Sequence, residues 1–397
     1  MVVYSGAKPE LADIVKGFGS SLFDSKRLSP QQVKSLLNIV RCRTASMGGH
    51  EEVCDSCGTV TYSYNSCGDR HCPKCQENKQ LLWVEKLEKD VLPVKHYHII
   101  FTVPHSLNDI CLWDDRMYYS ILFKSVWDTL RSFGYTHYGV ESGAIAVLHT
   151  WGQNLSLHPH VHCIVPAAGF GIKGRWKNIG KSDDGFLYPV TQLSSTFKGK
   201  FLDSLKRNLR KQNNLSGFYA HIEKAYATKW VVHTEAPLSG VKQIIRYLGR
   251  YTHRIAISND RILKVTGNDV FFQAKDYRDN ATVKNTHLSG KEFLRRFVQH
   301  ILPKGFVRIR RYGIYNARVK RNLNLRFTAD DNGFDELIKQ TAPGKDEKDN
   351  TVGYIDLRNQ YRKCPYCKTG NLIRMKELPR IRSPAGHLPS ILKSFLI

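Results

Sequence analysis

Residues 155–167 read LSLHPHVHCIVPA, and this stretch predicts a half-buried β-strand that carries His160 and His162. Alternate side chains of a strand point to the same face, so the two imidazoles project together with their Cα atoms about 6.6 Å apart. His158 shares that face, but it lies about 13 Å from His162, too far to share an ion bound at about 2 Å. Pro159 indicates that the strand begins at His160. The stretch therefore predicts a pair of imidazoles that can converge on one metal ion.

A histidine pair on a strand face is more often structural than ligating, so the prediction needs support from other residues. We expect a third ligand from an adjacent strand. Gln153 lies seven residues before His160 and is placed to reach back across a hairpin. One oxygen donor beside two nitrogen donors suits Mg²⁺ or Mn²⁺ and leaves positions open for a phosphate. We therefore predict a catalytic Mg²⁺ or Mn²⁺ held by His160, His162 and Gln153.

Residues 239–252, SGVKQIIRYLGRYT, predict a helix that carries two tyrosines. Tyr247 and Tyr251 are four residues apart and are therefore neighbours on one helical face. Such a pair is more often a core or stacking pair. A tyrosine hydroxyl has a pKa near 10 and is a poor nucleophile unless a cation or a metal-polarised phosphate assists it. Cationic residues that can contact a DNA backbone accompany the pair: Lys242, Arg246, Arg250 and Arg254.

Six cysteines between positions 42 and 75 indicate a metal site rather than disulfides. Two CxxC pairs separated by fourteen residues supply the four thiolates of a tetrahedral structural Zn²⁺: Cys54, Cys57, Cys72 and Cys75. Four interleaved residues make a second zinc site possible: Cys42, His50, Cys67 and His71. In the alternative interpretation, the histidines face solvent or DNA and Cys42 packs under the preceding helix. The tail pair Cys364 and Cys367 has no obvious partner pair in the sequence, and a zinc knuckle there is the less favoured interpretation.

Pattern and composition predict an α+β protein of three parts. These are a helical, zinc-binding and DNA-binding region at 1–92, an endonuclease domain with a central antiparallel β-sheet flanked by helices at 93–310, and a basic region at 311–397. Expected strands cover 96–103, 144–151, 160–166, 229–235, 262–266 and 269–274. Expected helices cover 29–41, 77–92, 114–133, 193–211, 239–252 and 290–302. The charged stretch 341–350 is typical of a linker.

A net charge of +25 and a pI near 9.6 indicate a polyanionic partner, and nucleic acid is the leading candidate. The segment 307–327 has seven Lys or Arg residues and no acidic residue, and it predicts DNA contacts through Arg308, Arg310 and Arg311. A solvated helix face is the alternative interpretation of such a run. The sequence has neither a long apolar span nor a signal peptide, so we expect a soluble, cytoplasmic and nucleoid-associated protein without membrane contact.

Four stretches of the chain resemble the two-tyrosine rolling-circle transposases of the insertion-sequence ninety-one type, which belong to the HUH endonucleases. The resemblance runs from about Cys42 to Arg311. The matching stretches are CRTASMGGH (42–50), YNSCGDRHCPKCQ (64–76), HTWGQNLSLHPHVHCIVPAAGF (149–170) and YLGRYTHRIAISN (247–259). The resemblance implies that Tyr247 and Tyr251 are nucleophiles and that His160 and His162 bind the catalytic metal. Gln153 as third ligand is an analogy with related endonucleases.

The activity implied by this resemblance is a nicking and rejoining of single-stranded DNA through a 5′-phosphotyrosine intermediate. The expected substrates are transposon ends, single-stranded or in hairpins, and target DNA. Because the chain lacks a phosphate loop typical of motor enzymes, a host helicase and the replication machinery are expected partners. A rolling-circle replication initiator or a relaxase would share this chemistry. A zinc-dependent DNA-binding protein without catalysis is the alternative from another functional class.

Overall fold

The computed structural model describes residues 8–25, 28–75, 92, 94–171, 174–179, 185–235, 249, 255–276, 279–319, 321 and 363–381. Helices and antiparallel sheets are mixed along the chain, which confirms the predicted α+β class. No helix among these residues is long and apolar enough to cross a membrane.

A five-stranded antiparallel sheet forms the centre of the larger half of the molecule, with strand order β13-β5-β6-β3-β9. The strands are β3 (His96–Thr102), β5 (Gly143–Trp151), β6 (Leu157–Pro166), β9 (Val231–Thr234) and β13 (Ile309–Gly313). β3, β5, β6 and β9 correspond to four of the six predicted strands. The other two are β10 (Ile262–Thr266) and β11 (Asp269–Asp276), which belong to a separate sheet. β5 and β6 form a hairpin in which His149 pairs with His160 and Val147 pairs with His162.

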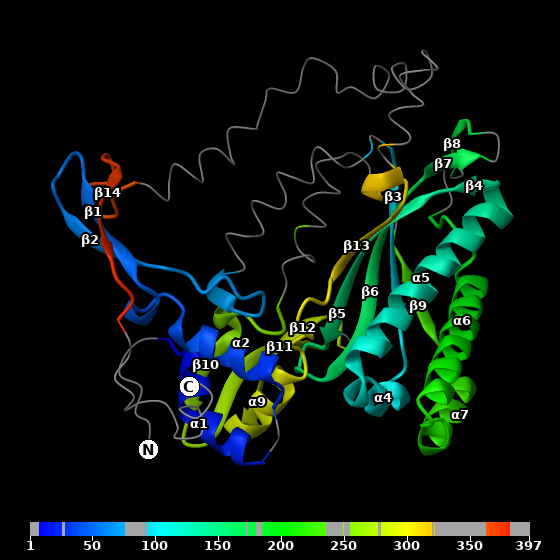
Figure 1. The fold of residues 1–397 in the computed structure, drawn as a ribbon, viewed down its shortest axis with the longest axis horizontal. Coiled ribbons are helices and arrows are strands. Elements are labelled where there is room, and N and C mark those ends of the chain that lie inside the picture. The colour runs from blue at the N-terminus through cyan, green and yellow to red at the C-terminus, as the bar shows by residue number, and fades with distance from the viewer. Residues whose placement is uncertain are drawn as a thin grey trace.

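Helices cover one face of this sheet (Figure 1). They are α4 (Asn108–Trp113), α5 (Asp115–Tyr138), α6 (Val190–Lys211) and α7 (Tyr219–Ala227). The Asp114 side chain caps α5 by accepting from the Met117 backbone N–H at 2.9 Å, and the helix ends at Gly139 with φ 64°. Between helices and sheet lies an aromatic-rich core that includes Phe101, Phe197 and Phe201. Each such side chain contributes roughly 1.5–3 kcal/mol by burial.

A second compact unit joins the N-terminal helices to a segment far along the chain. It consists of α1 (Leu11–Ser25), α2 (Pro30–Arg41), α9 (Gly290–Val298) and the sheet β10 (Ile262–Thr266), β11 (Asp269–Asp276) and β12 (Thr282–Ser289). α2 begins with the capping box of Ser29 and Gln32. α1 and α9 approach closely, because a Cβ added at Gly290 would lie 2.3 Å from the Phe18 ring.

The third sheet joins the two ends of the chain, in the order β14-β1-β2. Its strands are β1 (Gly49–Cys54), β2 (Val60–Tyr64) and β14 (Leu372–Leu378). In Figure 1 the red β14 lies beside the blue β1 and β2, away from the central sheet. Residues from 256–276 and 279–301 thus pack with the N-terminal helices, and residues 372–378 pair with the N-terminal hairpin. The predicted division into three parts stays a prediction.

The remaining elements are short. They are the small sheet β4 (Val140–Glu141), β7 (Ala168–Gly171) and β8 (Trp176–Asn178), and the 3₁₀ turns η1 (Ala45–Met47), η2 (His105–Leu107), η3 (Ser216–Phe218) and η4 (Asn259–Arg261).

Candidate functional site

The two faces of the central sheet differ in chemistry. On β6, Val161 and Cys163 point into the core under the helices, whereas the alternate residues His160 and His162 point to the opposite face. This opposite face, the histidine face, also carries His98 of β3 and His149 of β5, since antiparallel partners share a face. The sheet thus buries aliphatic side chains on one side and collects imidazoles on the other.

Three of these imidazoles form a compact group on β5 and β6. His149, His160 and His162 each offer a ring nitrogen, and these atoms all lie within 4.8 Å of one another. The His149 ring centroid is 5.4 Å from that of His160 and 4.5 Å from that of His162. Sequence reasoning missed His149, although its position directly opposite His160 follows from the register of the β5–β6 hairpin.

Hydrogen bonds orient two of the three rings. The His160 Nδ1–H donates to the His158 carbonyl at 2.7 Å. Nδ1 of His162 lies 2.9 Å from Nε2 of His98, and Nδ1 of His98 lies 3.1 Å from Oε2 of Glu235. With the Nδ1 proton of His98 directed at this carboxylate, His162 is the donor to Nε2 of His98. In this tautomeric arrangement Nε2 is the unprotonated nitrogen of both His160 and His162, and an unprotonated ring nitrogen is the atom that ligates a metal.

Burial keeps His160 neutral. Desolvation, aided by the nearby His158, lowers the pKa of His160 to about 4. A neutral imidazole is the form that binds a metal ion. Three such donors fit one divalent cation and leave further coordination positions for an external ligand.

Gln153, the predicted third ligand, lies outside the two strands that carry this group. It lies in the turn between β5 and β6, beyond the Trp151–Leu157 pair, and its backbone carbonyl accepts from Arg261. Leu157 is three residues, or about 10 Å, from His160 along the strand. The structure places His149 beside the two predicted histidines, and a ligand role for Gln153 stays a prediction.

A hollow lies at the end of the central sheet, beside His158. It is lined by residues of three strands, of η2 and of the end of α7: Thr102, His105, His158, Lys224, Lys229 and Val231. The His158 ring lies 5.1 Å from the His160 ring, so the hollow opens next to the group. Lys224 and Lys229 are exposed and give this end a positive charge.

The predicted tyrosines and their cationic neighbours lie outside the residues that the structure describes: Tyr247, Tyr251, Lys242, Arg246, Arg250 and Arg254. Three further predicted DNA contacts, Arg308, Arg310 and Arg311, occupy β13 or its start and are half-buried. The Arg310 guanidinium lies 4.2 Å from the Phe123 ring centroid, on the helical side. Burial and the neighbouring Arg70 lower the pKa of Arg308 to about 10. A DNA contact for these three residues stays a prediction.

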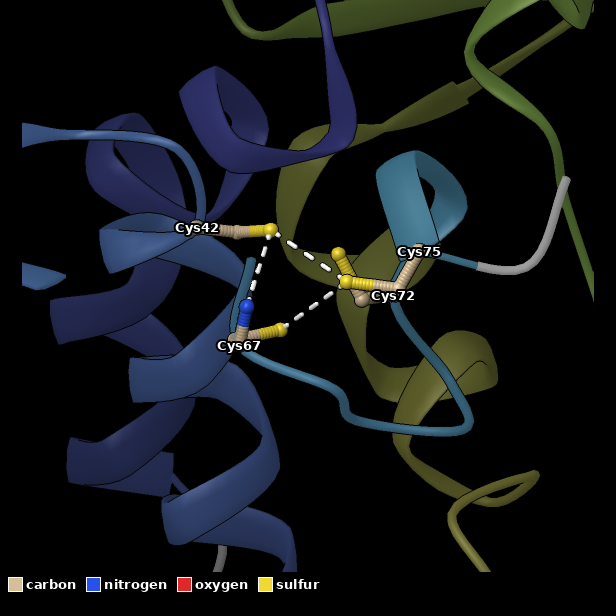
Figure 2. Close-up of side chains that lie close together, drawn as sticks. All are labelled: Cys42, Cys67, Cys72 and Cys75. Carbon is tan, nitrogen blue, oxygen red and sulfur yellow. Dashed lines mark hydrogen bonds between the residues drawn. The ribbon is translucent and has the colours of Figure 1, made fainter. Parts of the chain in front are cut away.

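A cysteine cluster lies inside the second compact unit, and we call it the inner cluster: Cys42, Cys67, Cys72 and Cys75. Figure 2 shows the four side chains pointing toward one another. The Cys75 sulfur lies 3.4 Å from that of Cys42 and 3.6 Å from that of Cys67. Four ligands on a zinc ion with bonds of about 2.3 Å would be about 3.8 Å apart. The geometry therefore suits a tetrahedral structural zinc.

A second group, the outer cluster, consists of Cys54, Cys57, Cys364 and Cys367. The predicted partition of the cysteines was thus wrong. Cys54 and Cys57 lie at the tip of the β1–β2 hairpin, whereas Cys42 and Cys67 flank its base. A strand of six residues separates tip from base by about 20 Å, so the two CxxC pairs of the N-terminal region cannot share one ion.

Neither predicted histidine ligand joins a cysteine cluster. Nε2 of His50 lies 3.0 Å from a carboxylate oxygen of Glu52. His71 is buried, and its Nε2 accepts from the Leu302 backbone N–H at 3.3 Å. Desolvation lowers the pKa of His71 to about 3, which keeps this acceptor neutral. His71 therefore connects the inner cluster to the chain that leads into β13.

The chain is similar to known transposases over most of its length. Residues 143–322 match a family model described as "Putative transposase", and residues 14–103 match one described as "Transposase zinc-binding domain". The "Putative transposase y4qJ" of Sinorhizobium fredii (strain NBRC 101917 / NGR234) is 36% identical over 396 residues, covering 95% of this chain and 97% of that protein. The "Transposase for insertion sequence element IS801" of Pseudomonas savastanoi pv. phaseolicola is 29% identical over 304 residues, covering 75% and 73%.

No solved structure matches the chain. The zinc-binding match supports a structural zinc in the cysteine-rich region, where the inner cluster supplies four thiolates. The match to the transposase model spans both β5 and β6, which carry the three grouped histidines. From the similarity over nearly its whole length, the chain belongs to the family of transposases of the insertion-sequence ninety-one type, which act on DNA.

Proposed function

We propose that the protein is a tyrosine-dependent DNA strand transferase that nicks and rejoins single-stranded ends of an insertion sequence. The observation that carries this proposal is the group of three ring nitrogens from His149, His160 and His162 within 4.8 Å. Three ring nitrogens that converge on one point of a strand face are not needed for packing, because buried polar groups require partners. A divalent cation explains why they are gathered.

The donor set bears on which ion is bound. Imidazole nitrogen suits transition metals, whereas Mg²⁺ prefers oxygen. With His149 beside His160 and His162, three of the protein donors are nitrogen, so Mn²⁺ fits better than Mg²⁺ of the two ions predicted. When bound, such a cation supplies Lewis-acid polarisation of a phosphate and stabilises the charge that develops on it.

The covalent step would belong to Tyr247 or Tyr251. The phenolic oxygen forms a bond to phosphorus and loses its proton, while the bond from phosphorus to the 3′-oxygen breaks and that oxygen takes up a proton. The products are a 5′-phosphotyrosine and a free 3′-hydroxyl. Because one phosphodiester bond is exchanged for another, rejoining needs no external energy source. Two tyrosines would allow one DNA end to be held while the other is cut.

The surface next to the histidines carries positive charge that suits a DNA backbone. The hollow beside His158 reaches the group from the end of the sheet and carries Lys224 and Lys229 at its rim. Lysines there would neutralise phosphates on the strand that approaches the ion. The high net charge of +25 favours DNA binding in the same way.

A cleavage assay with a single-stranded oligonucleotide derived from an element end tests the proposal. In Mn²⁺ the protein should form a covalent adduct, and mass spectrometry should locate it on Tyr247 or Tyr251. Substitution of the attached tyrosine by phenylalanine should remove the adduct and leave DNA retention unchanged. Tyr219→Phe, at an exposed tyrosine on α7, is the matched control. Retention of DNA without any adduct would indicate a zinc-dependent binding protein instead.

A further inference from the structure

The outer cluster joins opposite ends of the chain. The Cys54 and Cys367 sulfurs are 3.7 Å apart although 313 positions separate them, and the Cys57 and Cys364 sulfurs are 3.7 Å apart across 307 positions. All four sulfurs lie within 4.8 Å of one another. The two tail cysteines lie outside the matched zinc-binding domain, which covers residues 14–103.

The two CxxC pairs have the same backbone geometry. In the first, the Gly58 N–H donates to the Cys54 carbonyl at 3.1 Å; in the second, the Lys368 N–H donates to the Cys364 carbonyl at 3.0 Å. Both residues have positive φ, 68° for Gly58 and 60° for Lys368. A non-glycine residue in this left-handed conformation is strained, and it persists only where the surrounding structure imposes it. Lys368 thus completes a turn that mirrors the one after Cys57.

Backbone N–H groups point at the sulfurs of both pairs. The Ser56 N–H donates to the Cys54 sulfur at 3.4 Å, and the Gly370 N–H donates to the Cys367 sulfur at 3.3 Å. Donors aimed at sulfur stabilise a thiolate, which is the form that ligates a metal. The arrangement is that of two metal-binding knuckles facing each other.

Gly370 shows how closely the C-terminal segment approaches the turn at Cys54–Cys57. A Cβ at this position would lie 2.5 Å from the Cys54 sulfur and 2.6 Å from the Ser56 Cβ. The neighbouring Asn371 N–H donates to the Asp55 side chain at 2.7 Å, and its carbonyl accepts from the Asp55 N–H at 3.1 Å. Only a residue without a side chain permits this approach of the tail to the N-terminal knuckle.

Apolar packing contributes little to this junction. β14 is exposed along most of its length, with Ile373 50% and Met375 65% exposed. Its ladder with β1 is interrupted by an irregularity between Glu51 and Glu52. Backbone hydrogen bonds exchanged with water are a weak source of net stability, and joining residues more than 300 positions apart carries an entropic cost. A stronger bond is needed to hold the tail in place.

We infer that the outer cluster binds a second structural zinc ion, which fastens the C-terminal segment 363–381 to the N-terminal hairpin. Four thiolates in a closed set suit zinc. A disulfide would require two sulfurs at about 2.05 Å, whereas the close pairs here are 3.7 Å apart and all four sulfurs lie within 4.8 Å of one another. The site thus closes the polypeptide into a loop through metal rather than through a core. This inference does not depend on the proposed DNA chemistry.

Metal content measured by mass spectrometry on the purified full chain tests the inference. The unsubstituted protein should carry two zinc ions per chain, and the Cys364→Ser/Cys367→Ser variant should carry one. Gly370→Ala should also lose one ion although every ligand is kept, because its Cβ would displace the Cys54 sulfur. Tyr366→Ser, at a 70% exposed residue between the two cysteines, and Gly217→Ala, which meets no atom within 4 Å, should keep both. Two ions in the double serine variant would overturn the inference, as would one ion in the unsubstituted protein.

A cleavage experiment gives an independent readout. A specific protease site is placed within residues 341–350, the stretch predicted from sequence to be a linker, and the purified protein is cut. The tail fragment should remain bound to the rest of the chain on gel filtration and should separate in the Cys54→Ser/Cys57→Ser variant. A fragment that separates from the unsubstituted, zinc-loaded protein would contradict the metal junction, whatever the outcome of the DNA cleavage assay.

Discussion

The cysteine clusters and the histidine group differ in how completely they surround an ion. Each cysteine cluster supplies four sulfurs from loops and knuckles. Four protein ligands fill the coordination sphere of a tetrahedral ion, so no position is left for an external ligand. The histidine group supplies three nitrogens from a rigid hairpin and leaves positions for a ligand from outside. The difference indicates separate tasks: the closed sites hold distant parts of the chain together, and the open site, on a sheet whose other face is a packed core, is suited to chemistry.

The sharpest test of this division is removal of one histidine from the open site. His160→Ala should lower the rate of oligonucleotide cleavage on the order of 10³-fold, because the loss of a ligand removes the cation that stabilises the developing charge. The midpoint of thermal unfolding and the zinc content should change little, since the cysteine clusters are untouched. Cleavage is measured by gel assay in Mn²⁺. His221→Ala, at a half-buried histidine on α7 that pairs with Asp109, is the control.

Removal of a cysteine ligand should affect stability differently in the inner cluster and in the outer cluster. Cys72→Ser affects a fully buried ligand packed among the residues of the second compact unit, so unfolding should become easier by roughly 4 kcal/mol or more, as for other losses of a structural metal. Cys57→Ser affects an exposed ligand at a hairpin tip. Its cost to global stability should be below about 1 kcal/mol, because β14 packs little apolar surface. Chemical denaturation of both variants measures the difference, and equal losses would contradict the distinction between an inner and an outer cluster.

The elements that local patterns specify were predicted well. His160 and His162 lie on one face of a strand because side chains alternate, and this holds whatever the strand pairs with. Ser29 and Gln32 begin a helix because the capping box satisfies its first N–H groups from within the same turn. Both features depend only on near neighbours along the chain.

The features that were mispredicted depend on pairings between distant residues. His149 becomes a partner of His160 only through the register of β5 and β6, which the turn at 152–156 determines. Cys54 and Cys72 look like one site in sequence, yet the β1–β2 hairpin carries Cys54 away from the base. The partner of Cys57 is Cys364, at the other end of the chain, and no spacing rule reaches so far.

His96 provides a comparison within the histidine face, since it is a structural histidine rather than a member of the grouped three. Its Nδ1–H donates to the Val94 carbonyl at 2.7 Å, its Nε2 accepts from the Tyr315 hydroxyl, and burial lowers its pKa to about 4. Between pH 6.5 and 4 the unfolded chain binds a proton that the folded chain does not, so stability falls as the pH falls through this window.

The loss of folding stability caused by the lowered pKa of His96 amounts to about 3 kcal/mol, and it is complete below pH 4. Denaturant unfolding at several pH values should show a shallower slope between pH 6.5 and 4 in His96→Gln than in the unsubstituted protein. An unchanged slope would mean that other buried histidines, such as His300, account for the acid sensitivity.

A smaller effect is expected one step outside the open site. Glu235 accepts from His98, and His98 in turn holds the ring of His162. Glu235→Gln should weaken Mn²⁺ binding by about 10-fold, since such outer hydrogen bonds fix the tautomer and orientation of a ligand. Titration followed by the electron paramagnetic resonance of free Mn²⁺ measures the affinity. Cleavage at saturating Mn²⁺ should recover most of its rate, whereas a residue needed only for folding would lower stability without shifting the Mn²⁺ midpoint.

The hollow beside His158 should contribute the smallest of these effects, and only to DNA binding. Lys224→Ala/Lys229→Ala removes two exposed cations, which should weaken binding of a single-stranded oligonucleotide roughly 10-fold and reduce the slope of log K against log salt by about 1.4. The control Arg210→Ala/Lys211→Ala removes the same charge from the end of α6, about 25 Å along that helix from the turn near Trp230. Because both double variants change the net charge equally, an equal loss in the two would assign the effect to the overall field of the protein. A loss confined to the first would indicate that the strand reaches the histidine group through this end of the sheet.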